Sequence, residues 1–180
     1  MANGTKIDGR PALYPWRILG WGTAAALLLT PLVAMQFTSE VNWTASDFAF
    51  AGAMIGGVGI IYEFTLRKSH DRFYRGGVAL ALASSFLIVW ANGAVGMIND
   101  EGDPANLMFA GVLAIALLGS VLARFRAGGM AITMIAAAIA QAVAGGLGML
   151  LDLLGAVLSA GFAALWLVAA ALFRRAASPR

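Results

Sequence analysis

Blocks of roughly twenty apolar residues follow one another along the chain, separated by short polar segments. A helix rises about 1.5 Å per residue, so such a block is long enough to cross the ~30 Å hydrocarbon core of a bilayer. The pattern therefore predicts an all-α integral membrane protein, a helical bundle of about six transmembrane helices with short loops. The predicted spans are residues 18–37, 47–66, 76–98, 105–123, 129–150 and 154–173.

The last two predicted spans come from one unbroken apolar stretch, residues 129–173. This stretch is too long for a single crossing of the membrane. Asp152 lies near its middle, where a charged side chain is costly inside lipid. We therefore expect a tight turn at Leu151-Asp152 that divides the stretch into a hairpin of two spans.

The basic residues are confined to alternate connectors of this six-span arrangement. Because Lys and Arg accumulate on the cytoplasmic side of membrane proteins, this distribution predicts that both termini are cytoplasmic. The expected organisation is a cytoplasmic segment (1–17), one transmembrane bundle (18–173) and a cytoplasmic tail (174–180). The twelve basic residues are Lys6, Arg10, Arg17, Arg67, Lys68, Arg72, Arg75, Arg124, Arg126, Arg174, Arg175 and Arg180.

The amino-acid composition agrees with a membrane protein and argues against several kinds of catalytic and metal-binding site. The chain has 180 residues, of which 61% are hydrophobic and 12% charged. It has no cysteine and one histidine, His70, which argues against disulfides, thiol catalysis and zinc or haem sites. The basic residues flank the spans, so the high isoelectric point does not indicate nucleic acid. No enzyme motif is present, and we expect no enzyme activity, cofactor or bound metal.

The connector MQFTSEVNWTASDF (residues 35–48) holds two carboxylates, Glu40 and Asp47, and no basic residue. Thr44 and Asp47 match a capping box, in which Thr44 would accept a hydrogen bond from the backbone of Asp47 and Asp47 would reach back. Asp103-Pro104 is a second helix-start signal. Both acids are interpreted first as caps, and a ligand role for this connector is the alternative.

An acidic group, Asp100, Glu101 and Asp103, lies in another predicted outer loop. Carboxylate oxygens are ligands for hard divalent cations, but no EF-hand spacing is present. A solvated turn is the simpler interpretation.

Polar side chains inside the spans are the natural candidates for function, because burying them in lipid is costly. Glu63 lies four residues before Arg67, which favours an ion pair on one helix, and the alternative is a proton- or cation-handling carboxylate. Asn92 and Gln141 are expected to form hydrogen bonds between helices, and contact with a substrate is the alternative.

Small residues recur at four-residue spacing in three spans, a pattern that lets helix backbones approach closely in lipid. It predicts packing within the bundle, with self-association or docking on a partner subunit as the alternative. The stripes are Gly52/Gly56, Ala140/Ala144/Gly148 and Ala156/Ala160/Ala164.

Three segments carry a resemblance: PLVAMQFTSEVNWTASDF (31–48), IIYEFTLRK (60–68) and IVWANGAVGMINDEGDPANLMF (88–109). Together they resemble a family of small uncharacterised bacterial polytopic inner-membrane proteins, over roughly residues 30–125. The resemblance implies a multi-pass protein of the bacterial inner membrane and no particular reaction. The positions that match its motifs are Gln36, Glu40, Asn42, Trp43, Asp47, Glu63 and Trp90.

Two functions follow as hypotheses. The first is an accessory or scaffold subunit in contact with the lipid bilayer, packing as a homo-oligomer or against a larger membrane-protein complex. The alternative is a small-solute or ion transporter or channel, proton-coupled, that uses Glu63 with Asn92 and Gln141. The candidate functional residues are therefore Glu63, Asn92, Gln141, Asp47 and Glu40.

Overall fold

Helices make up nearly all of the computed structural model, which describes residues 15–94, 96–99, 102–149 and 152–178. Within these residues, six helical segments are long and apolar enough to cross a membrane, which confirms the predicted all-α membrane architecture. In chain order the elements are α1 (Pro15–Ala34), α2 (Ala45–Lys68), α3 (Arg72–Ala94), η1 (Pro104–Asn106), α4 (Leu107–Leu122), α5 (Ala127–Gly148) and α6 (Leu153–Ala177).

The chain divides into two compact units, residues 1–56 and 57–180, with the border inside α2. The first unit contains the first helix and the start of the second, and the single bundle that the sequence predicts over residues 18–173 stays a prediction. In the first unit, Leu28 Cδ2 of α1 lies 3.6 Å from the place that a Cβ on Gly52 of α2 would take. This is an ordinary van der Waals distance, so the contact between the two helices does not require glycine at this position.

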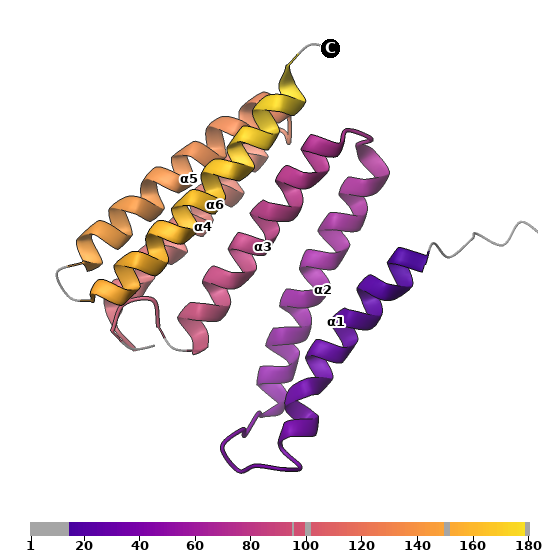
Figure 1. The fold of residues 1–180 in the computed structure, drawn as a ribbon, viewed down its shortest axis with the longest axis vertical. Helices are drawn as coiled ribbons and strands as arrows, with labels where there is room; N and C mark the ends of the chain where they lie inside the picture. Colours follow the sequence, from indigo (N-terminus) through magenta and orange to yellow (C-terminus); the bar gives the residue numbers. More distant parts are fainter. Residues whose placement is uncertain (1–14, 95, 100–101, 150–151, 179–180) are drawn as a thin grey trace, which may run out of the picture. The chain divides into compact units, whose positions relative to one another are not determined.

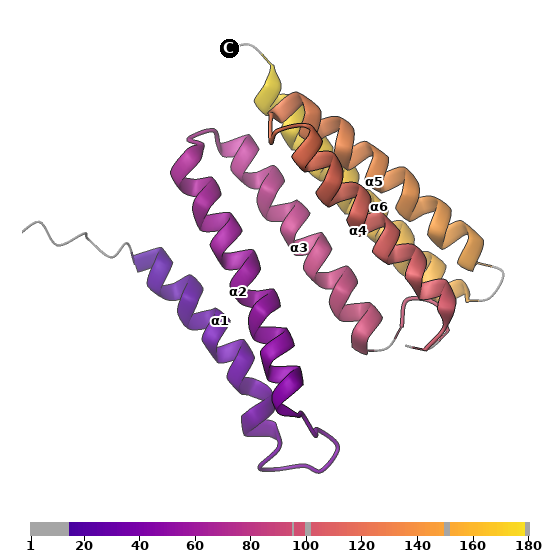
Figure 2. The same cartoon turned by 180° about the vertical axis from the view of Figure 1, so that it is seen from behind.

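The second unit is built on helices α3 to α6. Helix α6 packs against both α5 and α3, and α4 packs against α5. Helix α4 lies behind α6 in Figure 1 and in front of it in Figure 2. The core between them is apolar and fully enclosed, with Ile88, Phe109, Met134, Trp166 and Phe173 at most 1% exposed.

The predicted small-residue stripes have different outcomes in the two last helices. On α5, Ala144 and Gly148 are buried, as expected for packing within the bundle. On α6 the expectation is wrong, because Ala160 and Ala164 are exposed. The buried face of α6 contains Ser159 and Trp166 instead of the alanine stripe.

Helices α3 and α6 are antiparallel, and Gly77 near the start of α3 lies against the Phe173 ring near the end of α6. The Tyr74 hydroxyl donates a hydrogen bond to the Phe125 carbonyl at 2.7 Å, which brings the α4–α5 connector to the same end. We call this end of the second unit the basic end. Its arginines are Arg67, Arg72, Arg75, Arg124, Arg126, Arg174 and Arg175.

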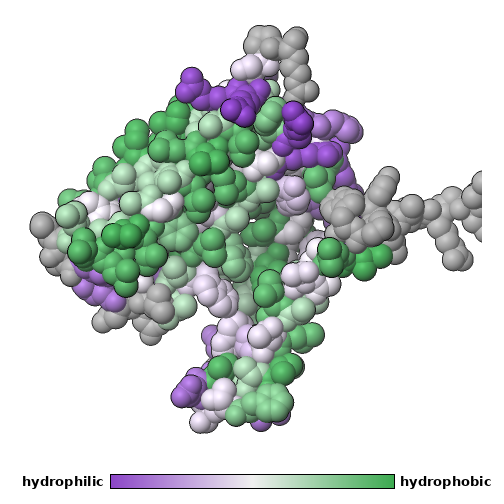
Figure 3. All heavy atoms as spheres, in the orientation of Figure 1, coloured by the Kyte–Doolittle hydropathy of each residue, from purple (hydrophilic) through white to green (hydrophobic). Residues whose placement is uncertain are grey.

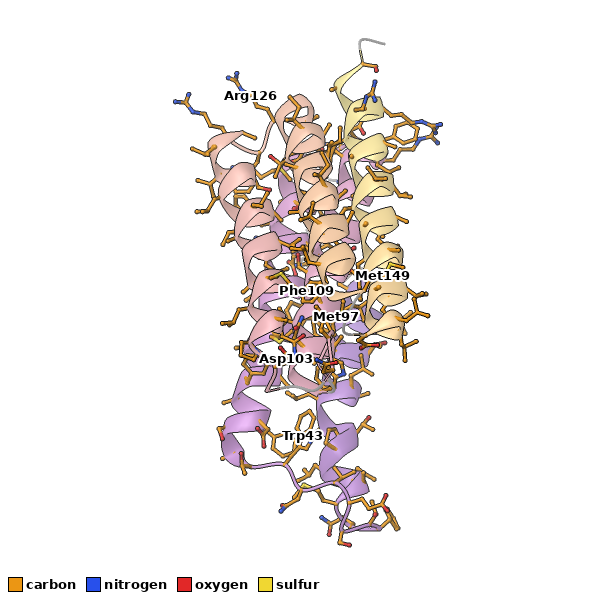
Figure 4. All side chains as sticks on the ribbon, turned by 90° about the vertical axis from the view of Figure 1, so that its left-hand side faces the viewer. Trp43, Met97, Asp103, Phe109, Arg126 and Met149 are labelled. Carbon is orange, nitrogen blue, oxygen red and sulfur yellow. The ribbon has the colours of Figure 1, made fainter. Side chains whose placement is uncertain are left out.

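The other end of the second unit holds the segment between α3 and α4 and the turn between α5 and α6, and we call it the loop end. Figure 4 shows Arg126 at the basic end and Asp103 at the loop end. In Figure 3 hydrophilic residues gather at the basic end, while the flank of the unit is largely hydrophobic. A charged end and an apolar flank are what a membrane-spanning bundle requires.

Two predicted boundaries are tested at the loop end. Helix α3 ends at Ala94, so the predicted span 76–98 is too long. Gly96 adopts a φ of 78°, a left-handed conformation that suits glycine and turns the chain away from the helix axis. The predicted division of residues 129–173 is confirmed, because α5 ends at Gly148 and α6 begins at Leu153.

Candidate functional site

A pair of hydrogen bonds joins α5 to α6 in the middle of the second unit. Gln141 Nε2 donates to Ser159 Oγ at 3.0 Å, and Ser159 Oγ donates to the Gln141 carbonyl at 2.9 Å. Both residues are completely buried. Gly145, one turn along α5, makes room for Ser159, since a Cβ on it would lie 2.5 Å from Ser159 Oγ. The predicted interhelical role of Gln141 is therefore confirmed.

Gln141 Oε1 has no hydrogen-bond partner in the part of the chain that is described, and three further buried side-chain atoms also have none. They are Ser84 Oγ and Asn92 Oδ1 on α3 and Trp166 Nε1 on α6. Buried polar atoms in proteins are nearly always hydrogen-bonded to protein or water. These four atoms therefore mark the polar interior of an otherwise apolar bundle.

The unpaired atoms fall at two levels of the bundle. Gly77 of α3 faces Phe173 of the antiparallel α6. Seven residues further along α3 is Ser84, and seven residues back along α6 is Trp166, so these two residues lie at the same level. The same count brings Asn92 level with the turn of α6 that carries Ser159, and hence with Gln141. The two levels are about 12 Å apart at the rise of a helix. One level combines a hydroxyl with an indole N–H, and the other combines two amide oxygens.

These levels differ in what they can bind. Two amide oxygens are acceptors, so the Asn92–Gln141 level suits a water molecule or the N–H or O–H groups of a small solute. Asn92 does not form the interhelical hydrogen bond that the sequence predicts. Its amide nitrogen donates to the Ile88 carbonyl of its own helix at 2.9 Å, which satisfies that donor locally.

The loop end is closed by residues of the α3–α4 segment that fold into the bundle. Met97, which is labelled in Figure 4, is buried although it lies outside any helix, and Ile98 is buried in the same way. Asn106 Oδ1 accepts hydrogen bonds from the backbone N–H groups of Met97 and Ile98, at 3.0 and 2.9 Å. One amide side chain thus replaces the backbone partners that these two residues lose at the end of α3.

This segment packs against the α5–α6 hairpin at two glycines, Gly148 and Gly155. A Cβ on Gly148 would lie 2.5 Å from Ile98 Cδ1, and a Cβ on Gly155 would collide with the Met97 carbonyl oxygen. The side chain of Ile98 and the backbone of Met97 therefore occupy space that any larger residue at these positions would fill.

Two carboxylates meet at Asn99 on the outer rim of the same end. The Asn99 backbone N–H donates to Asp152 Oδ2, and its amide nitrogen donates to Asp103 Oδ2. Asp103 also caps η1 by accepting from the Ala105 N–H at 2.8 Å, as predicted. The hydrogen bonds from Ala105 and Asn99 lower the pKa of Asp103, because they stabilise its charged form.

Within the described residues, no group of three potential ligands comes together. Asp100 and Glu101 of the predicted acidic group lie outside the described residues. Asp103 and Asp152 instead accept hydrogen bonds from backbone and amide N–H groups, and these bonds hold the residues of the rim together.

Glu63 forms the predicted ion pair with Arg67, at 2.7 Å between Glu63 Oε1 and an Arg67 terminal nitrogen. The Arg67 side chain is 69% exposed and that of Glu63 is 19% exposed. The pair lies at the basic end, on the last turns of α2. Glu63 is therefore an ion-paired carboxylate near the end of α2, five residues before Lys68.

In the first unit, Asp47 reaches back to the Thr44 backbone N–H at 2.7 Å, which is half of the predicted capping box. In the other half, the Asp47 N–H donates to Thr44 as predicted, but to its backbone carbonyl, at 3.1 Å, and not to its hydroxyl. The Thr44 hydroxyl instead donates to Asp47 Oδ2 at 2.8 Å. Glu40 is exposed, and its backbone N–H bonds Thr38 Oγ1. Glu40 and Asp47 belong to a different unit from Gln141.

Several residues of the polar interior and the loop end are absent from the sequence prediction. Ser84, Ser159 and Trp166 look like ordinary residues of apolar spans, and their burial depends on which helix faces which. Asn106 has a detectable signal, since it is an amide two residues after Pro104 of the Asp103-Pro104 helix start.

The class of protein that this architecture fits is a multi-pass helical membrane protein with a polar interior. No family model, curated protein or solved structure matches the chain. The resemblance to small bacterial inner-membrane proteins therefore stays a prediction.

Proposed function

We propose that this protein is an accessory or scaffold subunit that acts by helix–helix association in the membrane. The observation that carries the proposal is the open small-residue face of α2. Within the first unit, nothing lies within 4 Å of the place that a Cβ on Gly56 would take, whereas Gly52 on the preceding turn meets Leu28. In lipid, such a Gly-x-x-x-Gly face is suited to close contact with another helix.

The second unit supports the same proposal by contrast, because its close-packing glycines face neighbours. Gly119 lies against Thr133, Gly145 against Ser159 and Gly148 against Ile98. Helix α1 has no buried residue among residues 17–34. The exposure of α1 and the open space at Gly56 of α2 are the reasons why we assign the docking role to the first unit.

We further propose that the protein lies in the inner membrane of a bacterium, with the basic end and both termini in the cytoplasm. The gathering of arginines at one end of the second unit supports this orientation. The exposed Leu, Ile and Val side chains on the flanks support direct contact with lipid tails. The proposed partner is a second copy of the chain or a larger membrane-protein complex.

Native mass spectrometry of gently extracted protein tests the proposal. We expect the wild-type chain to be recovered with stoichiometric copies of itself or of a larger partner, and Gly56→Leu to abolish that association. Gly111→Leu is the matched control, because Gly111 is also a helical glycine with open space around it and lies on α4. Wild-type protein that is recovered as a monomer would overturn the proposal.

Transport of a small solute or ion is a second candidate, favoured by the unpaired buried atoms of Ser84, Asn92, Gln141 and Trp166. They offer hydrogen-bonding groups at two depths of an apolar bundle, as a solute pathway requires. Glu63, which the sequence assigns to this function, is bound to Arg67. Solute or ion flux into proteoliposomes that Gln141→Leu abolishes would favour this candidate over the scaffold.

A further inference from the structure

A groove lies between the start of α5 and the end of α6, at the basic end of the second unit. Its volume is about 550 Å³. The α5 side is apolar and includes Gly128, Ile132 and Ile135, while Arg174 and Ser178 of α6 supply the polar groups. Ile132 is 70% exposed, so the apolar side of the groove is open to the surroundings.

No side chain among the described residues neutralises the positive charge at this groove. Within the described residues, the Arg174 guanidinium forms no hydrogen bond or ion pair, and Ser178 Oγ donates to the Arg174 backbone carbonyl. The neighbouring Arg175 is placed differently, because its guanidinium lies 5.8 Å from the centre of the Phe73 ring. Arg174 therefore belongs to the groove, and Arg175 to the surface of α3.

The lining of the groove extends along α5 away from the basic end. Ile132 and Ile135 follow Gly128 by four and seven residues, which places them about 6 and 10 Å further along the helix axis. An occupant therefore meets an arginine at the polar boundary and apolar side chains below it. Gly128 keeps the entrance open, since nothing lies within 4 Å of the place that its Cβ would take.

We propose that this groove binds one anionic phospholipid. Its phosphate accepts hydrogen bonds from the Arg174 guanidinium, and an acyl chain lies along Ile132 and Ile135. Guanidinium groups bind phosphate oxygens in a bidentate manner, and basic pockets between membrane helices are suited to acidic headgroups. The combination of a single anionic group with a long apolar tail fits a phospholipid better than a free anion or an apolar helix.

This inference depends on membrane insertion and not on the scaffold role. The test is native mass spectrometry of the purified, delipidated full-length chain after incubation with phosphatidylglycerol or phosphatidylcholine. We expect one phosphatidylglycerol to be retained per chain in preference to phosphatidylcholine. Arg174→Gln should weaken that retention by about tenfold, the effect of one charge-assisted contact, while Arg175→Gln should leave it unchanged.

A second pair of variants tests the apolar part of the groove. Gly128→Leu should fill the entrance and reduce retention of phosphatidylglycerol. Gly146→Leu is its control, because Gly146 is an equally open glycine near the other end of the same helix. Circular dichroism should show wild-type helix content in all four variants.

Four results would overturn the proposal. The first is equal retention of the two lipids, and the second is an equal loss in both arginine variants, which would indicate general electrostatic attraction. The third is complete displacement of the lipid by inorganic phosphate, which would indicate an anion site without an acyl-chain groove. The fourth is a loss of homo-oligomer in Gly128→Leu with unchanged lipid retention, which would assign the groove to a second copy instead.

Discussion

The backbone carbonyl of Met97 lies against the α-carbon of Gly155, in space that a side chain at position 155 would occupy. Through this contact the segment after α3 is held on the α5–α6 hairpin. Asn106 fixes the segment from the other direction by binding the N–H groups of Met97 and Ile98. The loop end of the second unit is therefore a packed structure rather than a solvated connector.

Gly155→Ala is expected to destabilise the protein by about 1–3 kcal/mol, because overpacking forces the Met97 backbone to move. Gly161→Ala, on the same helix, should be neutral or stabilise by up to about 1 kcal/mol, since nothing lies near Gly161 and alanine favours helix. Unfolding of both variants in detergent measures the difference. Equal stability of the two variants would contradict the Met97–Gly155 contact.

Gln141 and Ser159 should show an energetic coupling of about 0.6–2 kcal/mol in a double-mutant cycle of Gln141→Leu and Ser159→Ala. The reason is that each residue supplies the other with a buried hydrogen-bond partner. Ser120→Ala is the control partner for Gln141→Leu, because Ser120 is also buried but bonds the Ala116 carbonyl of its own helix. The control cycle should give a coupling near zero.

Asp103 should make the stability of the protein depend on pH in acid. Its pKa in the folded chain lies below the ordinary value of 3.8, so the unfolded chain takes up the proton first as the pH falls. The stabilisation is therefore fully present above the unfolded pKa and is lost as the pH falls through the lower folded pKa.

The measurement for Asp103 is the free energy of unfolding of wild type and Asp103→Asn between about pH 7 and pH 2. The difference between the two proteins should be constant near neutral pH and should shrink below pH 3.8. Asn99→Ala should reduce the effect, because it removes one hydrogen bond to the carboxylate. A difference that does not change with pH would rule out this role for Asp103.

Glu63→Gln is expected to lower stability by at most about 0.5 kcal/mol, since the pair with Arg67 is a short-range helix pair whose arginine is exposed. If the protein is a scaffold, proteoliposomes containing wild type or Glu63→Gln should show the same background proton leak. Glu40→Gln serves as a control carboxylate in the first unit. Proton conduction by wild type that is lost in Glu63→Gln alone would support transport instead.

The structure agrees with the sequence prediction for features that a single segment of the chain can form by itself. The six apolar segments, the Glu63–Arg67 pair and the Asp103 cap all depend on residues that are close along the chain. The sequence predicts the end of α3 too late, because the apolar run of membrane length continues past Ala94. The turn at Gly96 and the burial of Ile98 are possible only when the α5–α6 hairpin receives them.

The sequence by itself determined that the chain forms membrane-length helices, because apolar length and charge position act through lipid and water rather than through other helices. Tertiary structure alone decided which polar residues meet: Ser159 with Gln141, Asn106 with Ile98, and Arg174 with the groove beside Ile132. These pairs depend on the rotation and register of whole helices. Packing between helices sets that rotation and register, and the residues of a single apolar span do not specify either of them.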